Sequence, residues 1–168
     1  WGPRQGDDCT VAVASVRPGQ VVSLFSGPPT DPSGDEAFVR AFERAPRPRI
    51  VCGGTTARVI ARGLGRTLRV GEEDSHIAPP SYAIDGVDLV TEGAVTLNQV
   101  ANILPVSPDR YDELSGVTRV ASLLHVADRV DLHVGRAAND ADRDLAFLQR
   151  GVRGRREILP ALAAQLRG

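Results

Sequence analysis

The sequence predicts an α/β fold, in which βαβ units surround a mostly parallel sheet and a β-hairpin precedes them. Two observations support this prediction. From Arg49 onward, short apolar runs rich in β-branched residues alternate with segments of helical periodicity, the pattern of a parallel sheet with helices on both faces. Before that point, two β-branched runs are separated only by Arg17-Pro18-Gly19, a turn signal typical of an antiparallel hairpin.

The hairpin is expected to consist of Cys9–Val16 and Gln20–Gly27, and its second strand can pair with either part of the chain. The stretch GPPTDPSG that follows is too rich in proline and glycine for regular structure. A helix is expected next, with Ser33 as its N-cap and Glu36 completing a capping box. Pro46 ends it, because proline cannot continue a helix.

The remaining elements follow the alternation from strand to helix. The expected strands are RIVC, TLRV, GVDLVTEG and VDLHVG, and the expected helices are GGTTARVIARGLG, AVTLNQVANIL, VTRVASLLHVADRV and RGRREILPALAAQLR. The last helix is expected to begin at Pro160 or to kink near it. The polar stretch GEEDSHIAPPSYAI is expected to be an irregular connection, and Ser107-Pro108 predicts a short helical turn. The stretch RAANDADRDLAFLQRG fits neither pattern clearly.

Composition excludes several classes of partner. The 168 residues are 42% apolar and 24% charged, as in an ordinary globular protein, and the net charge of -1 argues against a nucleic-acid or anionic-membrane partner. No apolar run approaches the roughly 20 residues of a membrane helix. The two cysteines, Cys9 and Cys52, have no CxxC or zinc spacing, and reduced thiols of this kind fit a cytoplasmic protein.

Two adjacent carboxylates, Asp7 and Asp8, stand at the start of an apolar strand in the stretch DDCTVAVASV. Paired carboxylates at a strand edge present oxygen ligands to a hard cation such as Mg²⁺ or Mn²⁺, and Thr10 can hold the loop by local hydrogen bonds. The simpler alternative is a turn, because Gly-Asp-Asp before a strand requires no chemistry.

The stretch DDCTVAVASV resembles the terminal motif of PPM-type, metal-dependent serine/threonine phosphatases, specifically the bacterial stage II sporulation protein E family. The stretches anchored by GPP, CGGTTA and DLVTEG resemble, in order, a C-terminal region found in some members of that family. The resemblance implies that Asp7 is a ligand of a dinuclear Mn²⁺ or Mg²⁺ centre, with Asp8 as its neighbour. It also implies a phosphoprotein substrate, dephosphorylated by a metal-bound water.

The resemblance divides the chain into residues 1–18, a terminal strand of a phosphatase β-sandwich, and residues 19–168, an α/β domain. The hairpin is then a remnant of the sandwich core, and the α/β portion from about residue 28 is expected to fold without it. The other metal carboxylates of the family lie upstream of the motif and are absent here. We therefore assign no catalytic residue and expect this chain to be inactive by itself, since several carboxylates are needed to fix two metal ions.

A second candidate site is the glycine turn CGGTTA, where Gly53, Gly54, Thr55 and Thr56 join a strand to a helix. Backbone N–H groups at such a helix N-terminus can bind a small anion, and the carboxyl ends of parallel strands are where open α/β sheets bind ligands. The structural alternative is that Thr55 or Thr56 caps its own helix. The turn VTEG, with Thr91 as an expected N-cap, is predicted to lie beside CGGTTA if the two strands are neighbours.

Other reactive residues form no motif. Cys52 precedes a helix start, where a thiolate is favoured, but no base can be identified and burial at a strand end is the simpler interpretation. His76, His125 and His133 lie on three different elements without ligand spacing. Two functions therefore remain: a segment of a phosphatase, or a regulatory, ligand-binding module that controls a phosphatase in cis.

Overall fold

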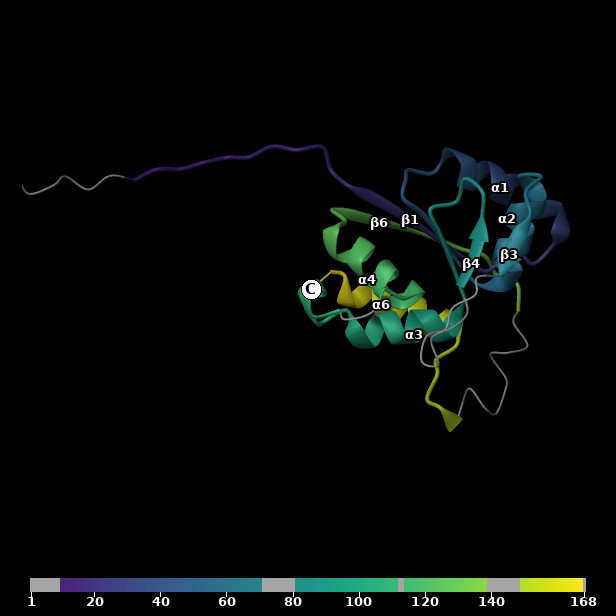
Figure 1. Cartoon of the computed structure of the whole chain (residues 1–168). Coiled ribbons are helices and arrows are strands. Elements are labelled where there is room, and N and C mark those ends of the chain that lie inside the picture. The colour runs from purple at the N-terminus through teal and green to yellow at the C-terminus, as the bar shows by residue number, and fades with distance from the viewer. Residues whose placement is uncertain (1–9, 71–80, 112–113, 139–148, 168) are drawn as a thin grey trace, which may run out of the picture.

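The computed structural model describes residues 10–70, 81–111, 114–138 and 149–167. These residues form an α/β domain with one mixed sheet of six strands in the order β3-β4-β5-β2-β1-β6 (Figure 1). The strands are β1 (Val21–Ser26), β2 (Arg49–Cys52), β3 (Leu68–Val70), β4 (Ser81–Ile84), β5 (Leu89–Thr91) and β6 (Arg129–Val134). The helices are α1 (Asp35–Arg44), α2 (Gly54–Gly63), α3 (Ala94–Ile103), α4 (Gly116–Val126) and α6 (Arg155–Gln165), with short 3₁₀ turns at Pro32–Gly34 and Pro108–Arg110.

The sheet is mostly parallel, as the alternation of strands and helices predicts. β1 pairs in parallel with both β2 and β6, and β2 pairs in parallel with β5. β4 is antiparallel to both β3 and β5. The α/β class is therefore confirmed, and the antiparallel corner at β3 and β4 is an addition to the predicted pattern.

Each face of the sheet carries its own core, because successive side chains of a strand point to opposite faces. Val22 and Leu24 of β1 pack on one face with the apolar sides of α3, α4 and α6. Phe25 packs on the other face with α1 and α2, where its ring meets the edges of Phe38 and Phe42. The central strands are thus buried on both sides, which explains their continuous apolar runs.

The predicted hairpin is wrong for the residues described. Val21–Ser26 is the parallel strand β1, and its two edges are already bonded to β2 and β6. An antiparallel partner from residues 10–16 therefore has no free edge to join. The expectation that residues from about 28 onward fold without this region stays a prediction, and the structure argues against it, because removing β1 would take Leu24 out of one core and Phe25 out of the other.

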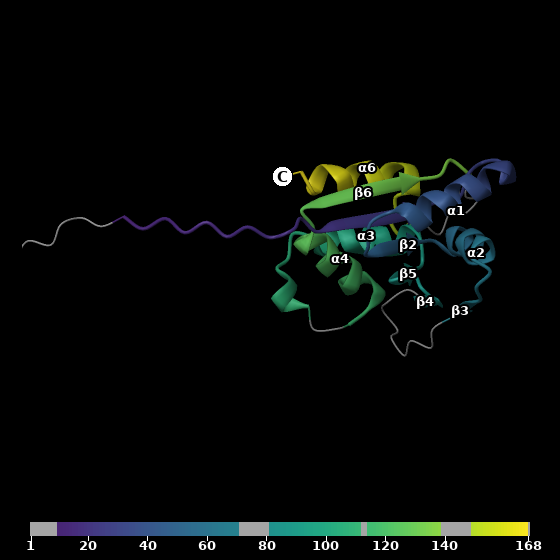
Figure 2. The ribbon, with the colours of Figure 1, turned by 90° about the horizontal axis from the view of Figure 1, so that it is seen from above.

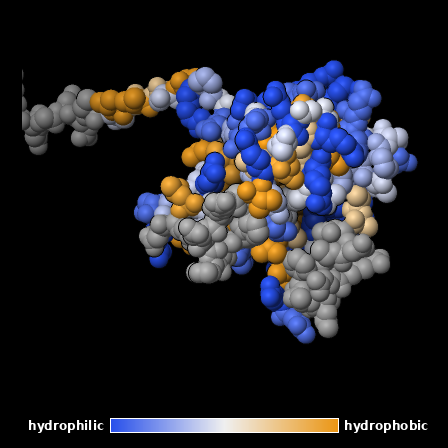
Figure 3. Space-filling view, turned by 45° about the vertical axis from the view of Figure 1, so that its right-hand side comes forward, coloured by the Kyte–Doolittle hydropathy of each residue, from blue (hydrophilic) through white to orange (hydrophobic). Residues whose placement is uncertain are grey.

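Residues 10–19 precede β1 as an extended segment outside the sheet, and they run away from the domain in both views (Figures 1 and 2). Their valines are exposed: Val11 by 79%, Val13 by 90% and Val16 by 95%. This apolar surface is visible as the hydrophobic stripe leading to the N-terminal end in Figure 3. The segment has strand-like composition but contributes nothing to the described cores.

The segment is fixed to the domain at one point. Arg17 forms a bidentate ion pair with Asp128, with N···O distances of 2.7 and 3.0 Å. Asp128 also accepts a 2.6 Å hydrogen bond from the Gln20 backbone N–H. The hydrogen bond from the Gln20 backbone N–H and those from the Arg17 side chain lower the pKa of the Asp128 carboxyl. The extended segment therefore leaves the domain from the loop between α4 and β6.

Several local predictions require correction. Ser33 does not cap α1: the 3₁₀ turn begins at Pro32, Asp31 accepts a hydrogen bond from the Ser33 backbone, and Gly34 occupies the N-cap position. SYAI is a strand and not part of an irregular connection, because its backbone pairs on both edges with β3 and β5. α6 begins at Arg155, so its start is not set by Pro160.

Other local predictions are confirmed. Ser107 and Pro108 occupy the N-cap and first positions of a 3₁₀ turn. The helices predicted from CGGTTA and from AVTLNQ are α2 and α3. No helix in the described part of the chain is long and apolar enough to cross a membrane.

The different environments of β1 and the preceding segment predict opposite outcomes for two truncations of apolar side chains. Leu24→Ala should lower the free energy of unfolding by about 2–5 kcal/mol, because it leaves a cavity beneath a fully buried strand. Val13→Ala should change it by no more than about 0.5 kcal/mol, because Val13 contacts solvent. Urea unfolding measures both, and comparable losses would show that the segment packs on the domain.

Candidate ligand-binding pocket

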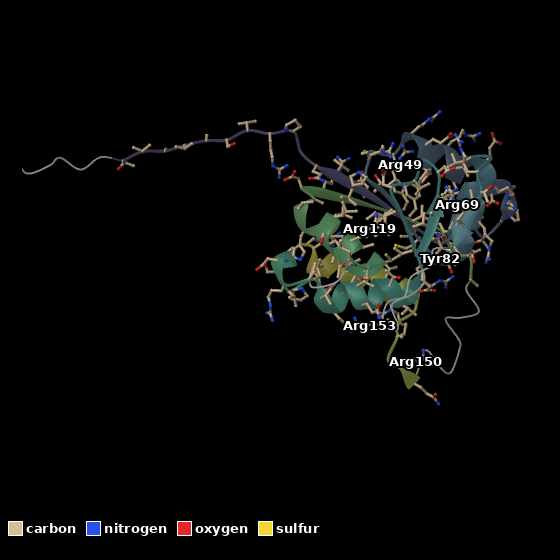
Figure 4. The ribbon with its side chains drawn as sticks, in the orientation of Figure 1. Arg49, Arg69, Tyr82, Arg119, Arg150 and Arg153 are labelled. Carbon is tan, nitrogen blue, oxygen red and sulfur yellow. The ribbon has the colours of Figure 1, made fainter. Side chains whose placement is uncertain are left out.

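A pocket of about 260 Å³ lies at the carboxyl ends of β1, β2 and β5. Its wall includes the ends of those strands and the first residues of α2 and α3. Tyr82 of β4, labelled in Figure 4, also lines it. Four of its lining residues are the predicted turn residues Gly53, Gly54, Thr55 and Thr56. The structure thus places the glycine turn at the carboxyl-terminal ends of the strands, where open α/β sheets bind ligands.

The pocket exists because two neighbouring strands send their helices to opposite faces. β2 continues into α2 on the face that buries Phe25, and the adjacent β5 continues into α3 on the face that buries Leu24. The chain therefore diverges at the ends of β2 and β5 and leaves a crevice between the two connections. The prediction that the turns CGGTTA and VTEG lie side by side is confirmed by this pairing.

Glycines allow the two turns to approach each other. A Cβ atom on Gly93 would lie 3.3 Å from the Cα of Gly53, tighter than most real contacts of this kind. Gly53 also has a φ of 115°, which side chains of L-residues rarely permit. A larger residue at either position would push α2 and α3 apart at the pocket floor.

Beyond the ends of β1 and β6, the described residues are joined by further backbone pairing. The Gly135 N–H donates to the Ser26 carbonyl and the Ala137 N–H to the Pro28 carbonyl, each at 3.1 Å. A Cβ on Gly135 would lie only 2.1 Å from the Pro28 oxygen, so glycine is required there.

Neither Thr55 nor Thr56 caps α2, which corrects the structural alternative. Gly53 occupies the N-cap position and provides no side chain. Thr56 is buried, and its Oγ1 accepts a 2.8 Å hydrogen bond from the Gly27 backbone N–H, which links the start of α2 to the end of β1. Thr55 is exposed at the pocket wall.

The backbone N–H groups of the turn fall into two sets: one bonds within the sheet, and the others lie at the start of α2 beside the pocket. The Gly53 N–H donates to the Thr91 carbonyl at 2.9 Å and so extends the sheet. The N–H groups of Gly54, Thr55 and Thr56 are in the first turn of α2, where helix geometry provides no acceptor within the helix. These three groups are the ones positioned to meet an anion.

The pocket also contains a buried charge that the sequence did not reveal. Arg155, the first residue of α6, is only 8% exposed, and its guanidinium donates to the Ala137 carbonyl. It packs against Gly27, where a Cβ would lie 2.4 Å from the Arg155 Cζ. Arg58 of α2 adds an exposed guanidinium. Arg155 follows the glycine turn by about a hundred residues, so no local motif could have identified it.

Cys52 has a structural role at the floor of this region. Burial raises the pKa of its thiol to about 12, even though the Thr91 hydroxyl, 3.4 Å from Sγ, lowers it; the nearby Glu92 carboxylate contributes a smaller rise to the same value. A thiol with that pKa is not a nucleophile at neutral pH. Thr91 is the last residue of β5, and Gly93 is the N-cap of α3, so the prediction of Thr91 as an N-cap is wrong.

The predicted metal ligands Asp7 and Asp8 lie outside the described residues. Within the residues that the structure describes, no group of three or more His, Cys, Asp or Glu side chains could hold a metal ion. His133 on β6 stacks on the Phe25 ring at 4.0 Å, and His125 on α4 lies near Tyr111. The two histidines therefore belong to separate elements, as their sequence spacing suggests, and His76 is outside the described ranges.

Comparison with protein-family models, with curated proteins and with solved structures finds no match for this chain. Function is therefore inferred from the pocket and from the sequence motifs.

The buried thiol predicts a clear chemical result. Iodoacetamide at mildly alkaline pH should leave Cys52 unmodified in the folded protein, because the thiol is inaccessible and protonated. The same reagent should modify it fully in urea. Peptide mass spectrometry resolves Cys52 from Cys9, and rapid modification of Cys52 in the native state would restore it as a candidate nucleophile.

Proposed function

We propose that residues 19–168 form a ligand-binding module that takes a small anion into the pocket at the ends of β1, β2 and β5. One observation carries this proposal: the N-terminus of α2 opens into the same pocket as the buried guanidinium of Arg155, at a point where neighbouring connections diverge. These features come from segments far apart in the sequence and meet at one place.

The electrostatics of the pocket favour a negative group near α2. The free N–H groups of a helix N-terminus carry partial positive charge, and an anion there is stabilised by hydrogen bonds as well as by the helix dipole. Arg155 adds a full charge in surroundings that water reaches poorly, where a charge-assisted hydrogen bond is stronger than at the surface. Arg58 at the pocket wall attracts an approaching anion.

The size of the pocket limits the ligand. Sites for drug-sized molecules usually measure roughly 300–1,000 Å³, and this pocket of about 260 Å³ is slightly smaller. Phosphate and short phosphorylated or carboxylated compounds fit such a volume, whereas a dinucleotide does not. The turn also lacks the lysine of a P-loop, which agrees with a small ligand.

Phosphate should therefore stabilise the protein through this pocket. Inorganic phosphate at concentrations well above its Kd should raise the Tm, because a ligand that binds only the folded state stabilises it. Gly54→Val should abolish that rise. A Cβ at Gly54 has only ordinary contact with the Tyr82 hydroxyl, 3.8 Å away, so the larger side chain projects toward the ligand space without disrupting the fold.

Two arginines provide a matched test of the electrostatics. Arg58→Gln should weaken phosphate binding by about three- to tenfold, the effect of one partly exposed charge. Arg66→Gln, another exposed arginine that lies beyond the C-terminal end of α2, should leave binding unchanged. Titration calorimetry measures both. Equal effects at the two positions, or no shift in the Tm of the unaltered protein with phosphate, would reject an anion site in the pocket.

We also propose that the chain is the C-terminal part of a PPM-type serine/threonine phosphatase, which this module regulates in cis. The exposed apolar segment 10–16 favours this second function, because an extended segment with valines 79–95% exposed is suited to pair within another sheet. In that arrangement Asp7 and Asp8 contribute to the Mn²⁺ or Mg²⁺ centre that acts on a phosphoprotein. The ion pair of Arg17 with Asp128 then joins that segment to the module.

The phosphatase proposal predicts no turnover by these 168 residues alone. With Mn²⁺ or Mg²⁺, hydrolysis of p-nitrophenyl phosphate and of a phosphoserine peptide should not exceed the metal-only blank, because one carboxylate pair cannot fix two ions. Joining the chain to the sequence that precedes it in its native reading frame should give metal-dependent turnover that Asp7→Ala removes. Failure of the joined protein to hydrolyse either substrate would contradict the assignment.

A further inference from the structure

The pocket contains a carboxylate as well as its arginines. Glu92 follows directly after β5 and lines the pocket wall, whereas Arg155 lies against Gly27 at the end of β1. β2 separates β5 from β1 in the sheet, so these opposite charges occupy different ends of the pocket. A simple anion would satisfy only the end at Arg155.

The Glu92 carboxylate has unused hydrogen-bonding capacity. Its Oε2 is buried and has no hydrogen-bond partner among the described residues. A buried polar atom without a partner is uncommon in native proteins, because it has lost its water without replacement. A donor group on a bound ligand is one way to supply the missing hydrogen bond.

The spacing of the strands gives the scale of a ligand that could bridge the two ends. Neighbouring strands are about 4.8 Å apart, so the ends of β5 and β1 are separated by roughly 10 Å. Hydrogen bonds of about 2.8 Å at each end leave roughly 4 Å between the charged groups of a bridging ligand. A spacer of about two carbon atoms covers that distance.

From this arrangement we infer that the ligand is a small zwitterion. Its phosphate or carboxylate binds at the N-terminus of α2 and Arg155, and its ammonium group binds the Glu92 carboxylate. This inference rests on the proposed anion site and adds the second charged group that the ligand must carry. An ammonium fits Glu92 better than a second acceptor does, because an ionised carboxylate only accepts hydrogen bonds.

Two compounds that differ in one group test the inference. O-phosphoethanolamine and ethyl phosphate share the phosphate and the two-carbon spacer, and the ammonium belongs only to the first. The unaltered protein should bind O-phosphoethanolamine at least tenfold more tightly in titration calorimetry, as expected for one charge-assisted hydrogen bond. Glu92→Gln should remove this preference while ethyl phosphate binds as well as before, or better.

Glu43→Gln is the matched control, because Glu43 is an exposed carboxylate on α1 and does not line this pocket. It should keep the tenfold preference. If the unaltered protein binds both compounds equally, or if Glu92→Gln keeps the preference, the zwitterion inference is wrong and the anion site stands. If neither compound binds, the anion site and the zwitterion inference are both overturned.

Discussion

The burial of β1 is the constraint on which the rest of the structure depends. This strand is bonded in parallel along both edges and covered on both faces, so each of its neighbours must be reached by a crossover connection. Val22 and Leu24 require helices on one face, and Phe25 requires them on the other. The two-sided arrangement of α1 and α2 against α3, α4 and α6 follows from the apolar side chains of one six-residue strand.

The same constraint creates the pocket. Because helices cover both faces of the sheet, the connections that follow two neighbouring strands turn toward opposite faces. This occurs at the ends of β2 and β5. Gly53 and Gly93 allow the two turns to approach each other at the base of the pocket. Arg155 belongs to α6, which packs on the face of the sheet that buries Leu24. At the opposite ends of these strands the chain is held by polar contacts, as Asp88 binds the Arg47 side chain and accepts a 2.7 Å hydrogen bond from the Arg49 backbone.

The sequence predicts elements well where the signal is local. Helical spacing and bounding glycines or prolines located α2 and α3, and Ser107-Pro108 located a 3₁₀ turn. Local signals failed where another segment competed. Ser33 has the chemistry of an N-cap, but its neighbours Asp31 and Pro32 form a 3₁₀ turn that includes it. β4 is a strand because the distant strands β3 and β5 offer it hydrogen bonds on both edges. A run of valines predicted a strand before Pro18 but could not identify its partner.

The sequence by itself determined the α/β class and the glycine turn at the end of β2, because hydrophobic periodicity and glycine conformation are local properties of the chain. Only the tertiary structure decided that β1 is a central parallel strand, that Thr56 bonds Gly27 and does not cap α2, and that Arg155 joins the pocket. The physical reason is that strand pairing, and the position of charged side chains in the pocket, depend on which segments the packed cores bring together. Those contacts link residues far apart in the chain, and no spacing within the sequence encodes them.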